Sequence, residues 1–233
     1  MNLISNLASA KGNSWVACFD LLGVANKTRM QGLAGVIPTY ETIICRIASL
    51  YQTSPKIRYM WFSDAFLFYT PPNSNLSFDA IDYVTILFDY LIQRGIPFRG
   101  ALAYGEFWAD EDDRIYAGKA FLDAHQYAEA QDWIGYVIAP SALAEIGTRA
   151  NPAERLRQHY RKVKVPLKSK YLRNQTDMTE DLYAFLFGSF HKCGHENCLK
   201  ALQDMKGQTG SEPTVLAKYD RTIGFLEGKT LIP

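Results

Sequence analysis

The feature that most constrains the fold is an apolar segment, residues 15–19, that runs into Asp20 and is followed by Leu21, Leu22 and Gly23. Its aromatic, β-branched and aliphatic residues are typical of a central strand buried on both faces. A carboxylate beside such a strand loses hydration, which only a cation, a metal or convergent hydrogen bonds can replace. We therefore expect Asp20 to have a charged or strongly polar partner.

A second aspartate stands in a similar setting. Two strand-like runs, residues 57–62 and 65–69, are separated only by Ser63 and Asp64, which is the length of a tight hairpin turn. Asp64 is therefore predicted to lie in that turn.

The order of the predicted elements is strand, helix, strand, strand, helix, strand. They cover residues 14–22, 38–51, 57–62, 65–69, 78–93 and 97–107, with Ser77 as N-cap and Gly95 as stop of the second helix. This order predicts an α/β (α+β) fold of the ferredoxin-like βαββαβ type. In a right-handed β-α-β unit the first two strands run parallel, so Asp20 and Asp64 converge at one edge. Two converging carboxylates predict a divalent metal site.

The rest of the chain predicts further strands and helices in one domain. We expect a helix at 118–133, a strand at 136–139 and a short helix at 141–147. Antiparallel strands at 163–167 and 182–187 follow, joined by a polar loop. The segment 191–206 is predicted to be helical at its end, and a closing helix is predicted at 214–227. No repeat or linker is visible. The sequence therefore predicts a single domain over residues 1–233, with its core at about 14–187 and a C-terminal helical extension at about 190–233.

Composition narrows the partners and the compartment. The chain has 233 residues, a net charge of +1 and 21% charged residues, so no bulk field favours nucleic acid or an anionic membrane, and any phosphate site must be local. The four cysteines are few, which indicates a reduced, cytoplasmic protein. No segment reaches about 18 uninterrupted apolar residues and no signal peptide is visible, so we expect no membrane span.

Several motifs together resemble those of the class III nucleotidyl cyclase domain, in the same order. They are Phe-Asp-Leu-Leu-Gly at 19–23, Ser-Asp at 63–64, Arg-Gly-Ala-Leu-Ala-Tyr-Gly at 99–105 and the helix at 118–129. The resemblance covers roughly residues 14–187. It implies that Asp20, Asp64 and the Leu21 carbonyl hold two Mg²⁺ or Mn²⁺ ions, which suit oxygen ligands. Gly23 and Val24, through their backbone, and the side chains of Arg99 and Lys168 would bind the triphosphate of the substrate.

Each of these residues also has a simpler interpretation. Asp20 fits a helix cap, and Asp64 an ordinary turn residue. Arg99 fits a surface salt bridge at a strand edge. Lys168 has close competitors in Lys164 and Lys170 on a solvated basic face.

The departures from purine cyclases are informative. The family's base-reading lysine is Met60 here, and the helix at 122–129 lacks the family's Asn and transition-state Arg, for which Arg114 or Arg161 of a partner copy are possible substitutes. A smaller pyrimidine fits a tighter aromatic wall, for which Tyr59, Met60, Tyr104 and Tyr116 are candidates, with core packing or dimer contact as the alternative for each.

The later motifs narrow the resemblance. Val-Pro-Leu-Lys at 165–168, Leu-Tyr-Ala at 182–184 and Lys218-Tyr219 with Thr222 and Phe225 are similar to bacterial Pycsar antiphage cyclases. That similarity implies a uridylate cyclase, or else a cytidylate cyclase. The antiphage similarity also implies a separate effector protein that senses the product. The wider class III resemblance implies a symmetric, head-to-tail homodimer with the site at its interface.

Other interpretations remain open from the sequence. A catalytically inactive nucleotide- or partner-binding module would explain the missing Asn and Arg. A diguanylate cyclase or polymerase palm is disfavoured, because the Gly-Gly-Asp-Glu-Phe turn is absent. The cluster of His191, Cys193, His195 and Cys198 favours a polar loop over a zinc site, because its ligands are contiguous rather than in two separated pairs.

Overall fold

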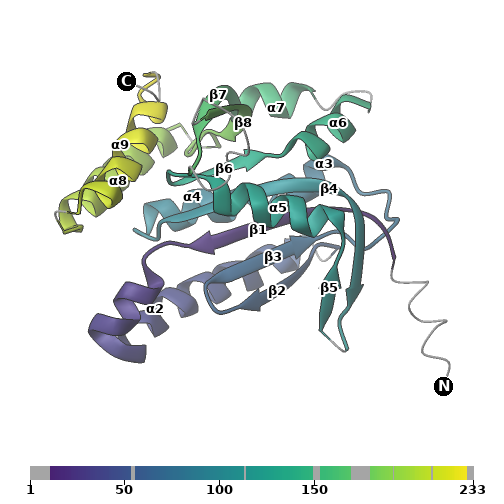
Figure 1. Cartoon of the computed structure of the whole chain (residues 1–233), viewed down its shortest axis with the longest axis horizontal. Coiled ribbons are helices and arrows are strands. Elements are labelled where there is room, and N and C mark those ends of the chain that lie inside the picture. Colours follow the sequence, from purple (N-terminus) through teal and green to yellow (C-terminus); the bar gives the residue numbers. More distant parts are fainter. Residues whose placement is uncertain are drawn as a thin grey trace.

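The computed structural model describes residues 11–53, 56–112, 114–148, 153–168, 179–190, 192–210 and 212–229. Its strands form one sheet in the order β2-β3-β1-β4-β6-β8-β7, and β5 pairs with β4 in a hairpin arm that extends from the sheet (Figure 1). The strands are β1 (Lys11–Leu21), β2 (Arg58–Phe62), β3 (Ala65–Tyr69), β4 (Phe98–Asp110), β5 (Ile115–Ala117), β6 (Gly135–Ile138), β7 (Tyr160–Pro166) and β8 (Thr179–Phe185). The mixed α+β architecture that the sequence predicts is confirmed.

Strand β1 lies in the middle of this sheet, as expected. It pairs antiparallel with β4 along its whole length and with β3 from Val16 to Asp20. Since β3 is also antiparallel to β2, strands β1 and β2 run in the same direction. The end of β1 and the β2–β3 turn therefore lie at one edge, which is the arrangement that the element order predicts.

Helices cover both faces of the sheet (Figure 1). On one face, α5 packs the small side chains of Ala120 and Ala124 against Val16 and Cys18 of β1. On the other face, aromatic β1 and β3 residues pack against α2, α3 and α4. The helices are α2 (Val24–Thr53), α3 (Phe78–Asp82), α4 (Thr85–Gln93), α5 (Lys119–Ala130), α6 (Pro140–Thr148), α7 (Ala153–His159), α8 (Gly194–Gln208) and α9 (Pro213–Leu226).

Helix α2 differs most from its prediction, because it begins at Val24 rather than near residue 38. Gly32 interrupts it with φ +64°, and Pro38 lies beyond that break. Proline is tolerated in the first turn of a helix, so two helical segments can meet here in one kinked element. By length and composition α2 also passes as a membrane-spanning helix, which the sequence did not suggest. Ile43 and Ile47 of α2 are buried against the sheet, but only 22% of its most apolar 18-residue window is buried.

Smaller differences concern the other elements. The predicted helix at 78–93 is two helices, α3 and α4, and Ser77 precedes α3 without a side-chain cap. Strand β5 and helix α7 are not predicted. The antiparallel pair β7–β8 is confirmed, while residues 169–178 of the loop between them lie outside the described residues.

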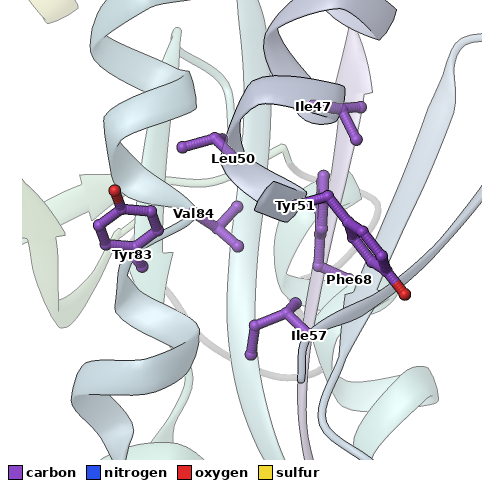
Figure 2. A pocket seen from close by; sticks show the side chains of 7 residues that line it. All are labelled: Ile47, Leu50, Tyr51, Ile57, Phe68, Tyr83 and Val84. Atoms are coloured by element: carbon purple, nitrogen blue, oxygen red, sulfur yellow. The ribbon is translucent and has the colours of Figure 1, made fainter. Parts of the chain in front are cut away.

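An apolar cavity lies between the end of α2 and the α3–α4 junction (Figure 2). It has room for about one water molecule, at about 20 Å³. Figure 2 shows the hydroxyls of Tyr51 and Tyr83 pointing away from it, while Leu50, Val84 and Phe68 face it. The cavity is a small packing gap with no polar side-chain group facing it, and neither Asp20 nor Asp64 lines it.

Candidate active site

The two aspartates meet where strand β1 ends. Asp20 pairs in register with Ala65, the residue after Asp64. The amide of Leu21 donates a 2.8 Å hydrogen bond to the carbonyl of Asp64, which ties the β2–β3 turn to the end of β1. Ser63 takes up the tight turn with φ +55°. The structure thus brings Asp20 and Asp64 together as the sequence predicts.

Burial and neighbouring charges act on the Asp20 carboxyl in opposite directions. Burial raises the pKa of the Asp20 carboxyl above its ordinary value, and the charge of Asp64 raises it further. The nearby Arg99 guanidinium and the His125 imidazole act in the opposite direction. The Asp20 carboxyl is therefore close enough to Asp64 for their charges to interact, and Arg99 is the largest opposing charge beside it.

Gly23 turns the chain from β1 into α2. Its φ of +80° is a conformation that side chains with a Cβ rarely adopt. The amide of Lys27 donates to the Gly23 carbonyl at 2.9 Å, so the helix begins immediately after the turn. The free amides of that first turn and the helix dipole favour an anion. A small pocket of about 80 Å³ beside this turn is lined in part by Gly23, Val24, Lys27 and Tyr40.

Arg99 and Lys168 converge on one backbone carbonyl at the end of α5. Arg99 Nη1 donates to the Glu129 carbonyl at 3.1 Å, and Lys168 Nζ donates to the same oxygen at 2.6 Å. The other Arg99 nitrogen, Nη2, lies 3.5 Å from Asp20 Oδ2, and the two side chains are 15% and 18% exposed. Arg99 is therefore a largely buried counter-ion of Asp20 rather than a surface salt bridge.

The same cluster retains an unused donor. Arg99 Nε is buried and has no hydrogen-bond partner among the described residues. A buried guanidinium donor without an acceptor is costly, and a phosphate oxygen would satisfy it. Lys168 is favoured over Lys164, which is exposed on β7, whereas Lys170 lies outside the described residues.

The protein supplies only part of the oxygen ligands that a hard divalent cation needs. Among the described residues no group of three or more His, Cys, Asp or Glu side chains is placed to hold a metal. Mg²⁺ is commonly bound by one or two carboxylates together with substrate phosphates. Asp20 and Asp64 match that pattern, so the residues fit a cation shared with a triphosphate.

The four proposed base-wall residues do not form one wall, which corrects the expectation for the set. Tyr59 lies on the α2 face, with its ring 6.1 Å from Phe68, and Tyr104 packs 4.7 Å from Trp15 on the same face. Met60 and Tyr116 lie on the opposite face, with α5. The sheet separates the two pairs, so only Met60 and Tyr116 remain together.

Helix α5 contributes residues that sequence reasoning missed. Its carbonyl at Glu129 anchors both cations, and His125 is near enough to influence Asp20. Lys27 on α2 was also missed, because that part of the helix was not expected. The position of Lys27, four residues after Gly23, could have indicated it from the sequence. Nothing in the sequence indicates that the backbone carbonyl of Glu129 is part of the site.

The other sequence candidates lie apart from this cluster. Arg161 donates to the Phe225 carbonyl of its own chain at 3.3 Å, and Arg114 is exposed in the β4–β5 hairpin with φ +56°. Cys193 is exposed whereas Cys198 is buried, and His191 lies outside the described residues. The described part of that cluster does not converge on a metal site.

Comparisons with known proteins identify the fold. No protein-family model and no curated protein match the sequence. The monomeric guanylyl cyclase domain of the RhoGC fusion protein from the aquatic fungus Blastocladiella emersonii is similar, with TM-score 0.53, 12% identity, and coverage of 76% of this chain and 96% of that one. The catalytic core of a rhodopsin-guanylyl cyclase with converted specificity, in complex with ATPαS, gives TM-score 0.54 at 11% identity over 75% and 96% of the two chains.

A third similar structure is the guanylate cyclase domain of RhGC from Catenaria anguillulae in complex with GTP. Its TM-score is 0.50 at 12% identity, over 75% of this chain and 97% of that one. The chain therefore has the fold of class III nucleotidyl cyclase catalytic domains.

Proposed function

We propose that this protein is a nucleotidyl cyclase that converts a ribonucleoside triphosphate to the 3′,5′-cyclic monophosphate and pyrophosphate. The observation that carries the proposal is the cluster of two carboxylates, Asp20 and Asp64, beside two cations, Arg99 and Lys168, at one end of a cyclase-type sheet. Opposite charges at this spacing suit a polyphosphate with its divalent cations.

The chemistry follows from where the charges lie. The 3′-oxygen bonds to the α-phosphorus, the bond from that phosphorus to the pyrophosphate oxygen breaks, and the 3′-hydroxyl proton passes to solvent water. Cations held by Asp20, Asp64 and the Leu21 carbonyl would make the 3′-hydroxyl more acidic and neutralise charge on the phosphates. Arg99 and Lys168 would bind the leaving pyrophosphate, and the amides around Gly23 and Val24 would orient it.

A pyrimidine base is proposed, with UTP ahead of CTP. Met60 stands where a purine cyclase has a lysine, and the structure places it with Tyr116 on the α5 face. A methionine and a tyrosine offer an apolar wall without the ammonium donor that a lysine would present to a purine. The product would then signal to a separate effector, in keeping with the similarity of residues 165–168 to antiphage cyclases.

A homodimer is proposed on the basis of exposed apolar side chains around the site. Phe62, two residues before Asp64, is 75% exposed, and Leu122 of α5 is 64% exposed. Met30 and Leu33 of α2 are 76% and 70% exposed. Large apolar side chains that gather near a site commonly mark a partner surface. A mass measurement by light scattering tests this, and a monomer at the concentration of the activity assay would contradict it.

Product analysis tests the activity. The purified protein is incubated with each of the four ribonucleoside triphosphates and Mn²⁺, and the products are separated by chromatography. We expect cyclic UMP as the main product, and its loss in Asp20→Asn and in Asp64→Asn. The matched control is Asp123→Asn, which changes a carboxylate on α5 that makes none of these contacts. No cyclic product from any nucleotide would refute the proposal, and equal turnover of ATP would refute the pyrimidine preference.

The alternative is an inactive nucleotide-binding module of the same fold. The helix at 122–129 lacks the family's Asn and transition-state Arg, and the exposed Leu122 side chain on it cannot donate a hydrogen bond. Binding of UTP with Mn²⁺ but no turnover, in a protein shown to be dimeric, would favour this alternative.

A further inference from the structure

The segment after α5 contains a fully buried glutamine whose hydrogen bonds are all satisfied. Gln131 Nε2 donates to the carbonyls of Gly100 at 2.8 Å and of Tyr127 at 2.9 Å. Its Oε1 accepts a 2.7 Å bond from Trp133 Nε1. The residue is 0% exposed. One side chain thus joins β4, the last turn of α5 and the segment leading to β6.

Two of these attachments lie close in sequence to residues of the triphosphate cluster. Gly100 follows Arg99 on β4, and Tyr127 lies one helical turn before Gln131, two residues before Glu129. The backbone of Gln131 also bridges to Leu167, the neighbour of Lys168. Gln131 therefore contacts the chain next to Arg99 and the chain next to Lys168.

The backbone on either side strengthens this connection. The Lys168 amide donates to the Ala130 carbonyl at 2.8 Å, and the Asp132 amide donates to Pro166 at 2.9 Å. At Gly100, an added Cβ would lie 2.7 Å from the Phe19 side chain and 2.8 Å from the Cys18 carbonyl, so β4 packs against β1 too closely there for any side chain. The Glu129 carbonyl, which accepts from both Arg99 and Lys168, is held between these fixed points.

We propose that Gln131 is a positioning residue for the triphosphate: it fixes the end of α5 against β4 so that the Glu129 carbonyl holds Arg99 and Lys168 side by side. The proposal rests on the proposed function for the identity of the ligand, but not on turnover. The Arg99 guanidinium and the Lys168 ammonium repel each other although they share the Glu129 carbonyl. The hydrogen bonds of Gln131 hold that carbonyl in place, so the two cations stay together until an anion replaces it as their acceptor. Without Gln131 the Glu129 carbonyl, which both cations contact, is no longer held in place.

The test uses Gln131→Met in the full-length protein, because methionine is of similar length and makes none of the three hydrogen bonds. Inorganic tripolyphosphate is the probe, titrated by calorimetry with and without Mg²⁺. We expect affinity to fall about tenfold or more, since small displacements of binding groups have large effects. In the cyclisation assay KM should rise more than kcat falls. If this variant does not fold, Gln131→Asn, which keeps an uncharged amide but is one methylene shorter, provides a second comparison.

Thr222→Val is the matched control. Thr222 is also 0% exposed, and its hydroxyl clamps the same connecting segment from the other end, accepting from the Ile134 amide at 3.0 Å and donating to the Ile134 carbonyl at 2.8 Å. It contacts neither Arg99 nor Lys168. We expect Thr222→Val to lower the melting temperature about as much as Gln131→Met does. Its tripolyphosphate affinity should stay within about twofold of the wild-type value, because Thr222 does not contact the two cations.

The outcomes separate the two proposals. Tripolyphosphate affinity that is equal in Gln131→Met and in the wild-type protein overturns the positioning role, as does an equal loss in Thr222→Val. Absence of tripolyphosphate binding to the wild-type protein also overturns it. Binding that depends on Gln131, in a protein that forms no cyclic nucleotide, supports the positioning role and refutes the cyclase proposal.

Discussion

Asp89 on α4 provides a quantitative test of how the C-terminal helices are held. The residue is 3% exposed, and its Oδ1 accepts a 2.7 Å hydrogen bond from the Gly188 amide. Its Oδ2 is buried with no hydrogen-bond partner among the described residues. Cys198 of α8 is nearby, where Gln93 Nε2 contacts its sulfur at 3.8 Å. Burial raises the pKa of Asp89 from 3.8 to about 7, partly offset by the Gly188 hydrogen bond.

The sign of the effect follows from proton linkage. Between about pH 4 and pH 7 the folded protein keeps a proton on Asp89 that the unfolded chain has lost, so the free energy of unfolding falls as pH rises through this range and is level above it. A shift of about 3 units corresponds to about 4 kcal/mol at pH 8, since each unit is about 1.4 kcal/mol. At pH 5 only about 1.5 kcal/mol of this penalty is present.

Asp89→Asn removes the titration and keeps the acceptor for Gly188. Relative to the wild-type protein, we expect the variant to gain about 2 to 3 kcal/mol in unfolding free energy between pH 5 and pH 8. Any constant cost of the new amide cancels in that difference. Cys198 does not interfere, because burial raises its pKa to about 12 and it stays a thiol at both pH values.

Urea unfolding followed by circular dichroism at pH 5, 6, 7 and 8 measures this difference. Asp204→Asn, an exposed position on α8, is the control and should show a pH-independent effect within about 0.5 kcal/mol. If the Asp89→Asn and wild-type curves run parallel from pH 5 to pH 8, then Asp89 is hydrated in solution and the reasoning from its burial is wrong.

Four further predictions concern the site and the core. Arg99→Gln should weaken tripolyphosphate binding by at least about tenfold in calorimetry, because a bidentate charged donor is lost, whereas Arg94→Gln should not. Mn²⁺ with UTP should raise the melting temperature, as ligand bound only to the folded state does, and the rise should vanish in Asp64→Asn. Val84→Ile should stabilise the fold by up to about 1 kcal/mol in urea unfolding by filling the cavity beside Leu50, and destabilisation would show that the cavity cannot accept a methyl group. Of the four cysteines, Cys45 and Cys193 should react rapidly with a thiol reagent at pH 8, while Cys18 and Cys198, both buried with pKa about 12, should react only on unfolding.

The order of strands and helices was predictable because each central strand is a compact apolar run with a clear stop. The turn at Ser63 and Asp64 and the end of β1 at Leu21 need only local information, and the parallel direction of β1 and β2 follows from the connection between them. Asp20 and Asp64 could therefore be paired without a structure. The first half of α2 could not be predicted, since Gly32, Gly35 and Pro38 read locally as a loop.

The shared contact of Arg99 and Lys168 with the Glu129 carbonyl was not predictable for a different reason. It consists of a backbone carbonyl that receives Arg99 and Lys168 from two strands separated by much of the chain. No side chain at Glu129 signals that role. Gln131 resembles any polar residue at a helix end in sequence, and only its complete burial identifies it.

The incorrect base wall has a physical origin that also narrows the substrate question. Strand β2 is a largely exposed strand at the edge of the sheet, but residues 59–62 are all aromatic or apolar, so the sequence shows no alternation that would reveal which face each one occupies. Register settles this: Tyr59 pairs with Phe68, whereas Met60 pairs with Leu67, and the two pairs point to opposite faces. Since α5 lies on the Met60 face with Tyr116, we expect base preference to depend on Met60 and not on Tyr59. Met60→Lys should therefore raise turnover of purine triphosphates relative to UTP, while Tyr59→Phe leaves the ratio unchanged, and a ratio that moves only in the Tyr59 variant would place the base on the other face.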